Sequence, residues 1–231
     1  MKILVTGTHF TPAVATMEKL QEYPDTRVVY AGRKTTQEGD SAPSVEAQIL
    51  PSLGVKFIPM IAGRLQRSFT IYTIPSLLKI PIGFIQSLFI VFAEKPDVIL
   101  SFGGYVAAPM VIMGWLFSIP IIIHEQTLVS GLANKISAWF ADKIAVSFPN
   151  TMKGEKVILT GNPVRRIIAS TKVRQDTKLP TILITGGNQG SHVINLSVED
   201  CIERLIKIAN IIHVTGDNKF KDCERLKEKE G

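Results

Sequence analysis

The stretch VTGTHFTPAVA, Val5 to Ala15, joins an apolar run to a glycine turn and a helix start. The run over residues 1–6 predicts a buried strand. The pair Thr11-Pro12 predicts a helix with Thr as N-cap and Pro at the first helical position. Strand, turn and helix in this order favour an anion site, because free N–H groups and the positive helix end converge there. Such turns usually hold several glycines, whereas this one has Gly7 and then His9.

Apolar runs alternate with helical patterns along the rest of the chain. We expect further strands at residues 27–31, 55–59, 98–101, 120–124, 142–148, 156–164, 181–185 and 210–217. We expect helices at residues 12–23, 75–93 with a break at Pro81, 107–117, 130–141 with Leu132, Ile136 and Phe140 on one face, 191–208, and in the charged tail. This alternation predicts an α/β fold with a parallel sheet and helices on both faces.

A polar segment divides the chain into two Rossmann-like parts. Residues 1–168 contain a complete set of strands and helices, residues 169–179 are expected to be a linker, and the pattern restarts over residues 180–231. Two strands and two helices cannot bury an ordinary α/β core. The second domain is therefore expected to be incomplete.

Composition narrows the class of partner. Of the 231 residues 45% are hydrophobic, and the formal net charge of +6 favours anionic partners. Nucleic acid is not expected, because the chain has no zinc-ligand spacing, no aromatic RNA-binding signature and no block of Lys and Arg. The two cysteines fit a reducing compartment, and the opening MKILVTG does not fit a signal peptide.

Residues 98–123 carry no charge over a length that a membrane-spanning helix would need. Paired glycines at 103 and 104 and prolines at 109 and 120 interrupt the segment. We therefore interpret it as a buried strand–helix–strand unit.

Three strand–turn–helix segments contain glycine: TGTH from Thr6, FGGYVAAP from Phe102 and TGGNQGS from Thr185. The turns of parallel strands meet at the carboxyl edge of a sheet, where α/β proteins bind ligands. Together they predict a phosphorylated ligand. None matches GxGxxG or GxxxxGK[ST], which argues against a nicotinamide dehydrogenase or a P-loop nucleotidase.

Five motifs in order, TGTHFTPA, LSFGGYVAAP, IIIHEQTLVSGLANK, TGNPVR and TGGNQGSHVIN, resemble the MurG family of glycosyltransferases. The resemblance covers nearly the whole chain. It implies a GT-B fold and transfer of N-acetylglucosamine from its UDP form to undecaprenyl-pyrophosphoryl-MurNAc-pentapeptide, known as lipid I. It also implies an inverting displacement with no essential metal and no cofactor.

The reaction needs a base for the acceptor hydroxyl and positive groups on the departing UDP. His9 and Glu125 are the candidate bases, and burial at a strand end is expected to raise the pKa of Glu125. The resemblance implies acceptor or pyrophosphate contacts from Thr8, His9, Gly103, Gly104 and Tyr105. It implies donor contacts from Thr127, Arg165, Gly187, Asn188, Gln189 and Gly190.

The resemblance implies a longer protein, because the family continues for more than a hundred residues beyond residue 231 and carries most donor contacts there. Within the matched part, the chain departs from the family pattern at three places. The first loop is shorter and poorer in glycine, although His9 and Pro12 keep their spacing. Thr127 stands where the family has asparagine, and Asn188 where it has serine. His124, beside Glu125, is expected to be structural.

Residues 47–93 lack Asp and Glu but include Lys56, Arg64, Arg67 and Lys79 among many apolar residues. An apolar surface rimmed by positive charge predicts peripheral binding to an anionic membrane. The resemblance implies that this is the cytoplasmic face, because lipid I lies in the inner leaflet. The apolar members of this segment are Phe69, Ile71, Tyr72, Ile74, Leu77, Leu78, Ile80, Ile82 and Phe84.

Two other interpretations remain open. The chain could be a non-catalytic acceptor-binding fragment or subunit, with a partner chain supplying the donor site. It could also be a UDP-sugar epimerase of the same fold, although HEQ and GGYVAAP favour the transferase.

Overall fold

The computed structural model describes residues 1–35, 44–61, 63, 73–171, 178–187, 190–216 and 220–227. The chain divides into two compact units, Met1–Thr171 and Lys172–Gly231. The expected linker, residues 169–179, spans this division, but its first residues belong to helix α6 (Arg166–Ser170).

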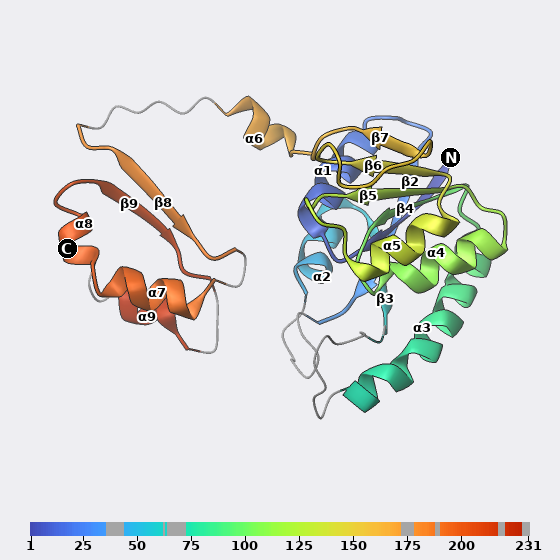
Figure 1. Cartoon of the computed structure of the whole chain (residues 1–231), viewed down its shortest axis with the longest axis horizontal. Coiled ribbons are helices and arrows are strands. Elements are labelled where there is room, and N and C mark those ends of the chain that lie inside the picture. Colours follow the sequence, from blue (N-terminus) through green and yellow to red (C-terminus); the bar gives the residue numbers. More distant parts are fainter. Residues whose placement is uncertain are drawn as a thin grey trace. The chain divides into compact units, whose positions relative to one another are not determined.

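The first unit is built on a parallel sheet of seven strands in the order β3-β2-β1-β4-β5-β6-β7 (Figure 1). The strands are β1 (Lys2–Gly7), β2 (Arg27–Arg33), β3 (Lys56–Met60), β4 (Val98–Phe102), β5 (Ile121–Glu125), β6 (Lys143–Val146) and β7 (Val157–Leu159). The predicted α/β fold class with a Rossmann-like first domain is therefore confirmed.

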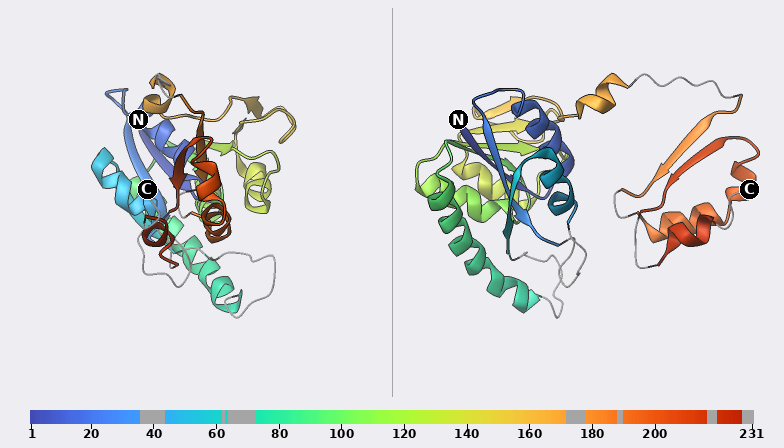
Figure 2. Two further views of the ribbon diagram at one scale, coloured as in Figure 1. Left: turned by 90° about the vertical axis from the view of Figure 1, so that its left-hand side faces the viewer. Right: turned by 180° about the vertical axis from the view of Figure 1, so that it is seen from behind.

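Helices cover both faces of this sheet, and each face has its own core. One core contains Val14 and Met17 of helix α1 (Phe10–Leu20) and Leu50 of the 3-10 helix η1 (Leu50–Leu53). Helix α2 (Val45–Ile49) directly precedes η1. Helices α3 (Thr73–Glu94), α4 (Ala107–Leu116) and α5 (Leu132–Phe140) cover the other face (Figure 2). Ile90, Met110 and Ala138 belong to this second core.

The uncharged segment 98–123 forms β4, α4 and β5, as predicted. Ile99, Met110 and Ile121 in it are fully buried. Its lack of charge is thus explained by burial within the domain.

Three expected element boundaries are wrong. Helix α1 begins at Phe10 with His9 as N-cap, so Pro12 lies at its third position and Thr11 does not cap it. Helix α3 continues through Pro81, which is exposed. A proline removes one helical hydrogen bond, and at an exposed position water can satisfy the freed carbonyl. Residues 191–208 form two short helices, α7 (His192–Glu199) and α8 (Ile202–Leu205).

The second unit contains the parallel pair β8 (Thr181–Thr185) and β9 (Asn210–Val214), followed by α9 (Asp222–Lys227). Apolar side chains of this pair remain accessible, with Leu183 63% and Ile212 54% exposed. Two strands thus leave much of the apolar surface of this unit uncovered, as expected from their number.

Candidate functional site

Strands β1, β4 and β5 bring their carboxyl ends together at one edge of the sheet. Gly7, the last residue of β1, pairs in register with Phe102, the last of β4, and β5 ends beside them at Glu125. The loops after these strands carry the motifs TGTH, FGGY and HEQT. The topology therefore gathers two of the three predicted turns and the HEQ segment at one edge.

The first two loops are locked to each other. The Thr8 backbone N–H donates to the Gly103 carbonyl at 2.9 Å. Gly104 has φ +83°, and a Cβ there would lie 2.1 Å from the Thr8 hydroxyl oxygen. Gly104 is thus required both by its backbone conformation and by the close approach of Thr8.

His9 is oriented by a backbone carbonyl. Its Nδ1 lies 2.9 Å from the Phe102 carbonyl oxygen. A carbonyl can only accept, so Nδ1 carries the proton and the neutral ring keeps its lone pair on Nε2. The ring is partly exposed, and Nε2 makes no hydrogen bond with the described part of the chain. This geometry leaves Nε2 available as a hydrogen-bond acceptor.

Glu125 is buried and fully hydrogen-bonded. One carboxylate oxygen accepts from the Thr127 N–H at 3.0 Å and from the Thr127 hydroxyl at 2.6 Å. The other accepts from the Ser130 hydroxyl at 2.9 Å and from Asn134 Nδ2 at 2.8 Å. Burial acts to raise the pKa of Glu125, but these donors outweigh it and the pKa is lowered. The expectation of a raised pKa is wrong.

Asn134 connects Glu125 to the second glycine loop. A Cβ on Gly103, which has φ +70°, would lie 2.4 Å from Asn134 Oδ1. The Asn134 amide therefore lies directly against the Gly103 backbone while its Nδ2 donates to Glu125. Through Asn134, the Glu125 carboxylate thus helps to hold this glycine loop in position.

His124 has the environment of a structural residue. It is buried, its Nε2 lies 3.3 Å from the Gly161 carbonyl, and burial lowers its pKa. Its ring lies against Phe102 with 5.4 Å between ring centroids. Tyr105, expected at the acceptor, is partly buried and packs against the second core, the one that contains Met110.

Two residues expected at the donor make internal contacts in this unit. The Thr127 hydroxyl is held by Glu125 and the Val129 carbonyl. Arg165 pairs with Glu18 of α1, with its Nε 2.9 Å and its terminal nitrogen 2.6 Å from one carboxylate oxygen. Arg165 thus ties the segment after β7 to α1.

The third glycine turn belongs to the second unit and follows β8. The Gly187 N–H donates to the Thr185 hydroxyl at 3.2 Å, and the Gly190 N–H donates to the Gly187 carbonyl at 3.0 Å. Asn188 and Gln189, expected to contact the donor, lie outside the described residues.

Sequence reasoning missed Ser130, Asn134 and Glu18. The expected apolar face of α5 is largely exposed, with Leu132 at 62%, whereas Asn134 and Ser137 are buried. One signal was available in the sequence: Ser130, Asn134 and Ser137 recur at helical spacing shortly after Glu125, which indicates a polar side of the helix that faces this carboxylate. No group of His, Cys, Asp or Glu that could hold a metal occurs within the described ranges.

Residues 3–146 match the glycosyltransferase family 28 N-terminal domain. A Clostridium kluyveri protein named UDP-N-acetylglucosamine–N-acetylmuramyl-(pentapeptide) pyrophosphoryl-undecaprenol N-acetylglucosamine transferase is 35% identical over 244 residues. A Clostridium novyi protein with the same name is 36% identical over 245 residues. Each alignment covers 100% of this chain, which spans 66% of the length of each relative.

Solved structures share the fold. MurG of Acinetobacter baumannii superposes with a TM-score of 0.63 at 23% identity, over 97% of this chain and 61% of that one. A UDP-N-acetylglucosamine 2-epimerase from Listeria monocytogenes, described as putative, gives a TM-score of 0.63 at 14% identity, over 100% and 66%. The family match covers more than half of the sequence, so the chain belongs to glycosyltransferase family 28.

Proposed function

We propose that this protein transfers N-acetylglucosamine from UDP-N-acetylglucosamine to the MurNAc 4-hydroxyl of undecaprenyl-pyrophosphoryl-MurNAc-pentapeptide. The observation that carries the proposal is the match of the entire chain, at 35% identity, to a relative named for this activity. The epimerase alternative rests on fold alone, since that neighbour is 14% identical.

His9 is the proposed general base. Its Nε2 takes the proton of the acceptor hydroxyl as the oxygen attacks the anomeric carbon and the bond to UDP breaks. The Phe102 carbonyl holds Nδ1–H at 2.9 Å and stabilises the imidazolium that forms. Attack from the face opposite UDP inverts the anomeric centre.

Glu125 is proposed to position the site. Its oxygens already accept five hydrogen bonds, one of them a long contact from Gln126 Nε2, and its lowered pKa makes it a weak base near neutral pH. Through Asn134 it supports Gly103, next to the backbone N–H groups at the start of α4. Those groups suit an acceptor pyrophosphate, and the backbone N–H groups at the start of α7, after the TGGNQG motif, suit the UDP phosphates.

The test is transfer of labelled N-acetylglucosamine to a lipid I analogue by wild type, His9→Ala and His9→Gln. Loss of a general base lowers kcat by roughly a hundredfold or more, and both variants should show it while still binding UDP-N-acetylglucosamine. Thr11→Ala, at an exposed neighbouring position, is the matched control and should keep wild-type activity. Wild-type turnover that both His9 variants retain would remove His9 from the mechanism.

Peripheral attachment to the cytoplasmic face of the membrane is proposed as part of this function, and helix α3 supports it. Ser76, Gly83 and Ser87 are on its buried side. The large apolar residues point outward at helical spacing: Ile74, Leu78, Ile82, Ile85, Phe89 and Phe92, which are 43–69% exposed. This distribution is the reverse of that of a helix on a water-facing surface.

Neighbouring helix ends extend this apolar surface. Trp115 and Leu116 of α4 are 54% and 60% exposed, and Phe117 contacts Phe92 at 4.9 Å between ring centroids. Ser76–Glu94 is also long and apolar enough to span a bilayer by length and composition. Because α3 packs through Ile90 and Val91 onto the sheet, we propose that it lies on the membrane surface. Arg64, Arg67, Phe69, Ile71 and Tyr72 of the predicted surface lie outside the described residues.

A further inference from the structure

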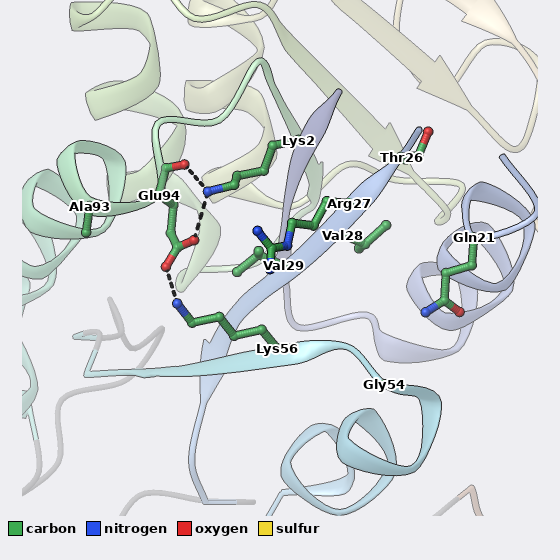
Figure 3. Close-up of a pocket in the computed structure, with 10 residues that line it drawn as sticks. All are labelled: Lys2, Gln21, Thr26, Arg27, Val28, Val29, Gly54, Lys56, Ala93 and Glu94. Atoms are coloured by element: carbon green, nitrogen blue, oxygen red, sulfur yellow. Dashed lines mark hydrogen bonds and ion pairs between the residues drawn. The ribbon is translucent and has the colours of Figure 1, made fainter. Parts of the chain in front are cut away.

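A pocket of about 460 Å³ opens at the amino edge of the seven-stranded sheet, opposite the edge that carries His9 and Glu125 (Figure 3). The first residues of three adjacent strands line it: Lys2 of β1, Arg27 of β2 and Lys56 of β3. Glu94, from the last turn of α3, adds one carboxylate to this lining, and Ala93 lies beside it. Parallel strands thus bring three cationic side chains together at one end.

Glu94 holds two of these cations in place. Its carboxylate oxygens lie 3.3 Å from Lys2 Nζ and 2.5 Å from Lys56 Nζ. The Lys2 ammonium also donates to the Glu94 carbonyl at 2.5 Å. The hydrogen bond from Lys56 is the main cause of the lowered pKa of Glu94, which stays ionised near neutral pH. Asp97 accepts from the Lys2 backbone N–H at 2.6 Å and does not line the pocket.

Arg27 is the cation that this arrangement leaves available. Its guanidinium makes no hydrogen bond or ion pair with any described residue, and it extends toward the Lys2–Glu94–Lys56 cluster (Figure 3). Three cations against one carboxylate give this lining a formal charge of +2. An ammonium has three donors, so Lys2 and Lys56 can bind a further acceptor while they hold Glu94.

We propose that this pocket binds a phosphate group, with the Arg27 guanidinium as its principal contact and Lys2 and Lys56 beside it. The planar guanidinium matches two phosphate oxygens at once, and the lysines add charge. The volume is sufficient for a small phosphorylated molecule.

The phosphate has two possible sources. One is a membrane phospholipid headgroup, because Ala93 continues the exposed apolar side of α3 after Phe89 and Phe92. The other is a soluble phosphorylated metabolite.

The test titrates the full chain with sn-glycerol 1-phosphate by calorimetry and NMR. Wild type should bind, and Arg27→Ala should weaken binding about tenfold, the loss expected for a charge-assisted hydrogen bond. The affinity of Arg27→Lys should lie between those of wild type and Arg27→Ala, because lysine keeps the charge but cannot bind two phosphate oxygens at once. Arg166→Ala is the matched control, since Arg166 is 87% exposed and its partner is Glu22. The Arg27 side chain has no partner to lose among the described residues, so both Arg27 variants should unfold at the wild-type temperature. Arg166→Ala loses only an exposed pair and should unfold close to that temperature.

Sedimentation with phosphatidylglycerol and phosphatidylcholine vesicles separates the two sources. Phosphatidylglycerol binding that falls in Arg27→Ala identifies a lipid headgroup. Arg27-dependent binding of glycerol phosphate without an effect on vesicles identifies a soluble ligand. Absence of glycerol phosphate binding by wild type at millimolar concentration overturns the proposal. An equal loss in Arg166→Ala also overturns it, because the effect would then be one of net charge. Neither result bears on transferase activity, which is measured separately.

Discussion

Glu125 and His9 are the two candidate bases of the site. They differ in which of their side-chain atoms are already used by hydrogen bonds. Glu125 is surrounded by donors, whereas His9 has one nitrogen fixed and the other available. Both residues stand in loop motifs of the sequence, and nothing in those motifs distinguishes their chemistry. The distinction arises from Thr127 and Ser130 in the loop after β5 and from Asn134 of α5, which all donate to the Glu125 carboxylate.

Glu125→Gln should destabilise the first unit by roughly 2 kcal/mol at pH 7, because charge-assisted hydrogen bonds are lost in a buried place. The pKa of Glu125 in the folded state lies below its ordinary value of 4.5. The carboxylate therefore stabilises the fold above that value, and this contribution is lost as the pH falls through the folded-state pKa. Urea unfolding at pH 7 and pH 3 checks this. A destabilisation of equal size at both values would contradict it.

Gly104→Ala should lower both stability and activity. The added Cβ would meet the Thr8 hydroxyl at 2.1 Å in a backbone conformation that L-residues avoid, so the contact between the two loops must open. We expect a loss of about 1–3 kcal/mol in urea unfolding. Gly54→Ala is the control, since Gly54 also has a positive φ of +67° but nothing within 4 Å of its Cβ position. A similar activity in the two variants would show that the loop contact is not needed.

At the scale of elements, helix α3 has the most unusual distribution of residues. With 22 residues it is about 33 Å long. Up to Phe89 its buried residues, among those described, are small, Ser76, Gly83 and Ser87, while large apolar side chains are exposed; only near its end are Ile90 and Val91 buried. Its sequence alone, interrupted by Pro81, predicted two shorter pieces. The packing of Ile90 and Val91 on the sheet supports a continuous helix and determines which side is exposed.

The double variant Leu78→Ser and Phe89→Ser should reduce sedimentation with phosphatidylglycerol vesicles severalfold while leaving the thermal unfolding midpoint nearly unchanged. Both residues are more than 65% exposed, so their removal costs little in the folded protein and much at a membrane surface. Ile158→Ser on β7, which is 48% exposed, is the matched control. Unchanged vesicle binding in the double variant would exclude α3 as the membrane surface.

At the scale of the whole molecule, the chain consists of two units with unequal cores. Both hydrophobic clusters of the seven-stranded sheet lie within Met1–Thr171. The Arg165–Glu18 pair and strand β7 also belong to this unit. It therefore has what an independently folding domain needs.

A fragment of residues 1–171 should unfold cooperatively, within a few degrees of the first transition of the full chain in calorimetry. A fragment of residues 1–146 should unfold at a lower temperature, because it lacks both β7 and Arg165. Failure of the longer fragment to fold would show that the first unit depends on residues after 171.

The sequence by itself determined the alternation of strands and helices, the parallel sheet, the three glycine turns and the resemblance to one family. These properties depend on local periodicity and on short motifs, which are readable along the chain. Tertiary structure alone decided that Glu125 is surrounded by donors, that His9 Nε2 has no hydrogen-bond partner in the described part of the chain, that α3 exposes its apolar side and that Arg27 lines one pocket with two lysines. The surroundings of His9 and Arg27 depend on residues distant in sequence, which come together only once the strands are paired. The donors to Glu125 are close to it in sequence, but they converge on its carboxylate, and lower its pKa, only when the segment after β5 is folded.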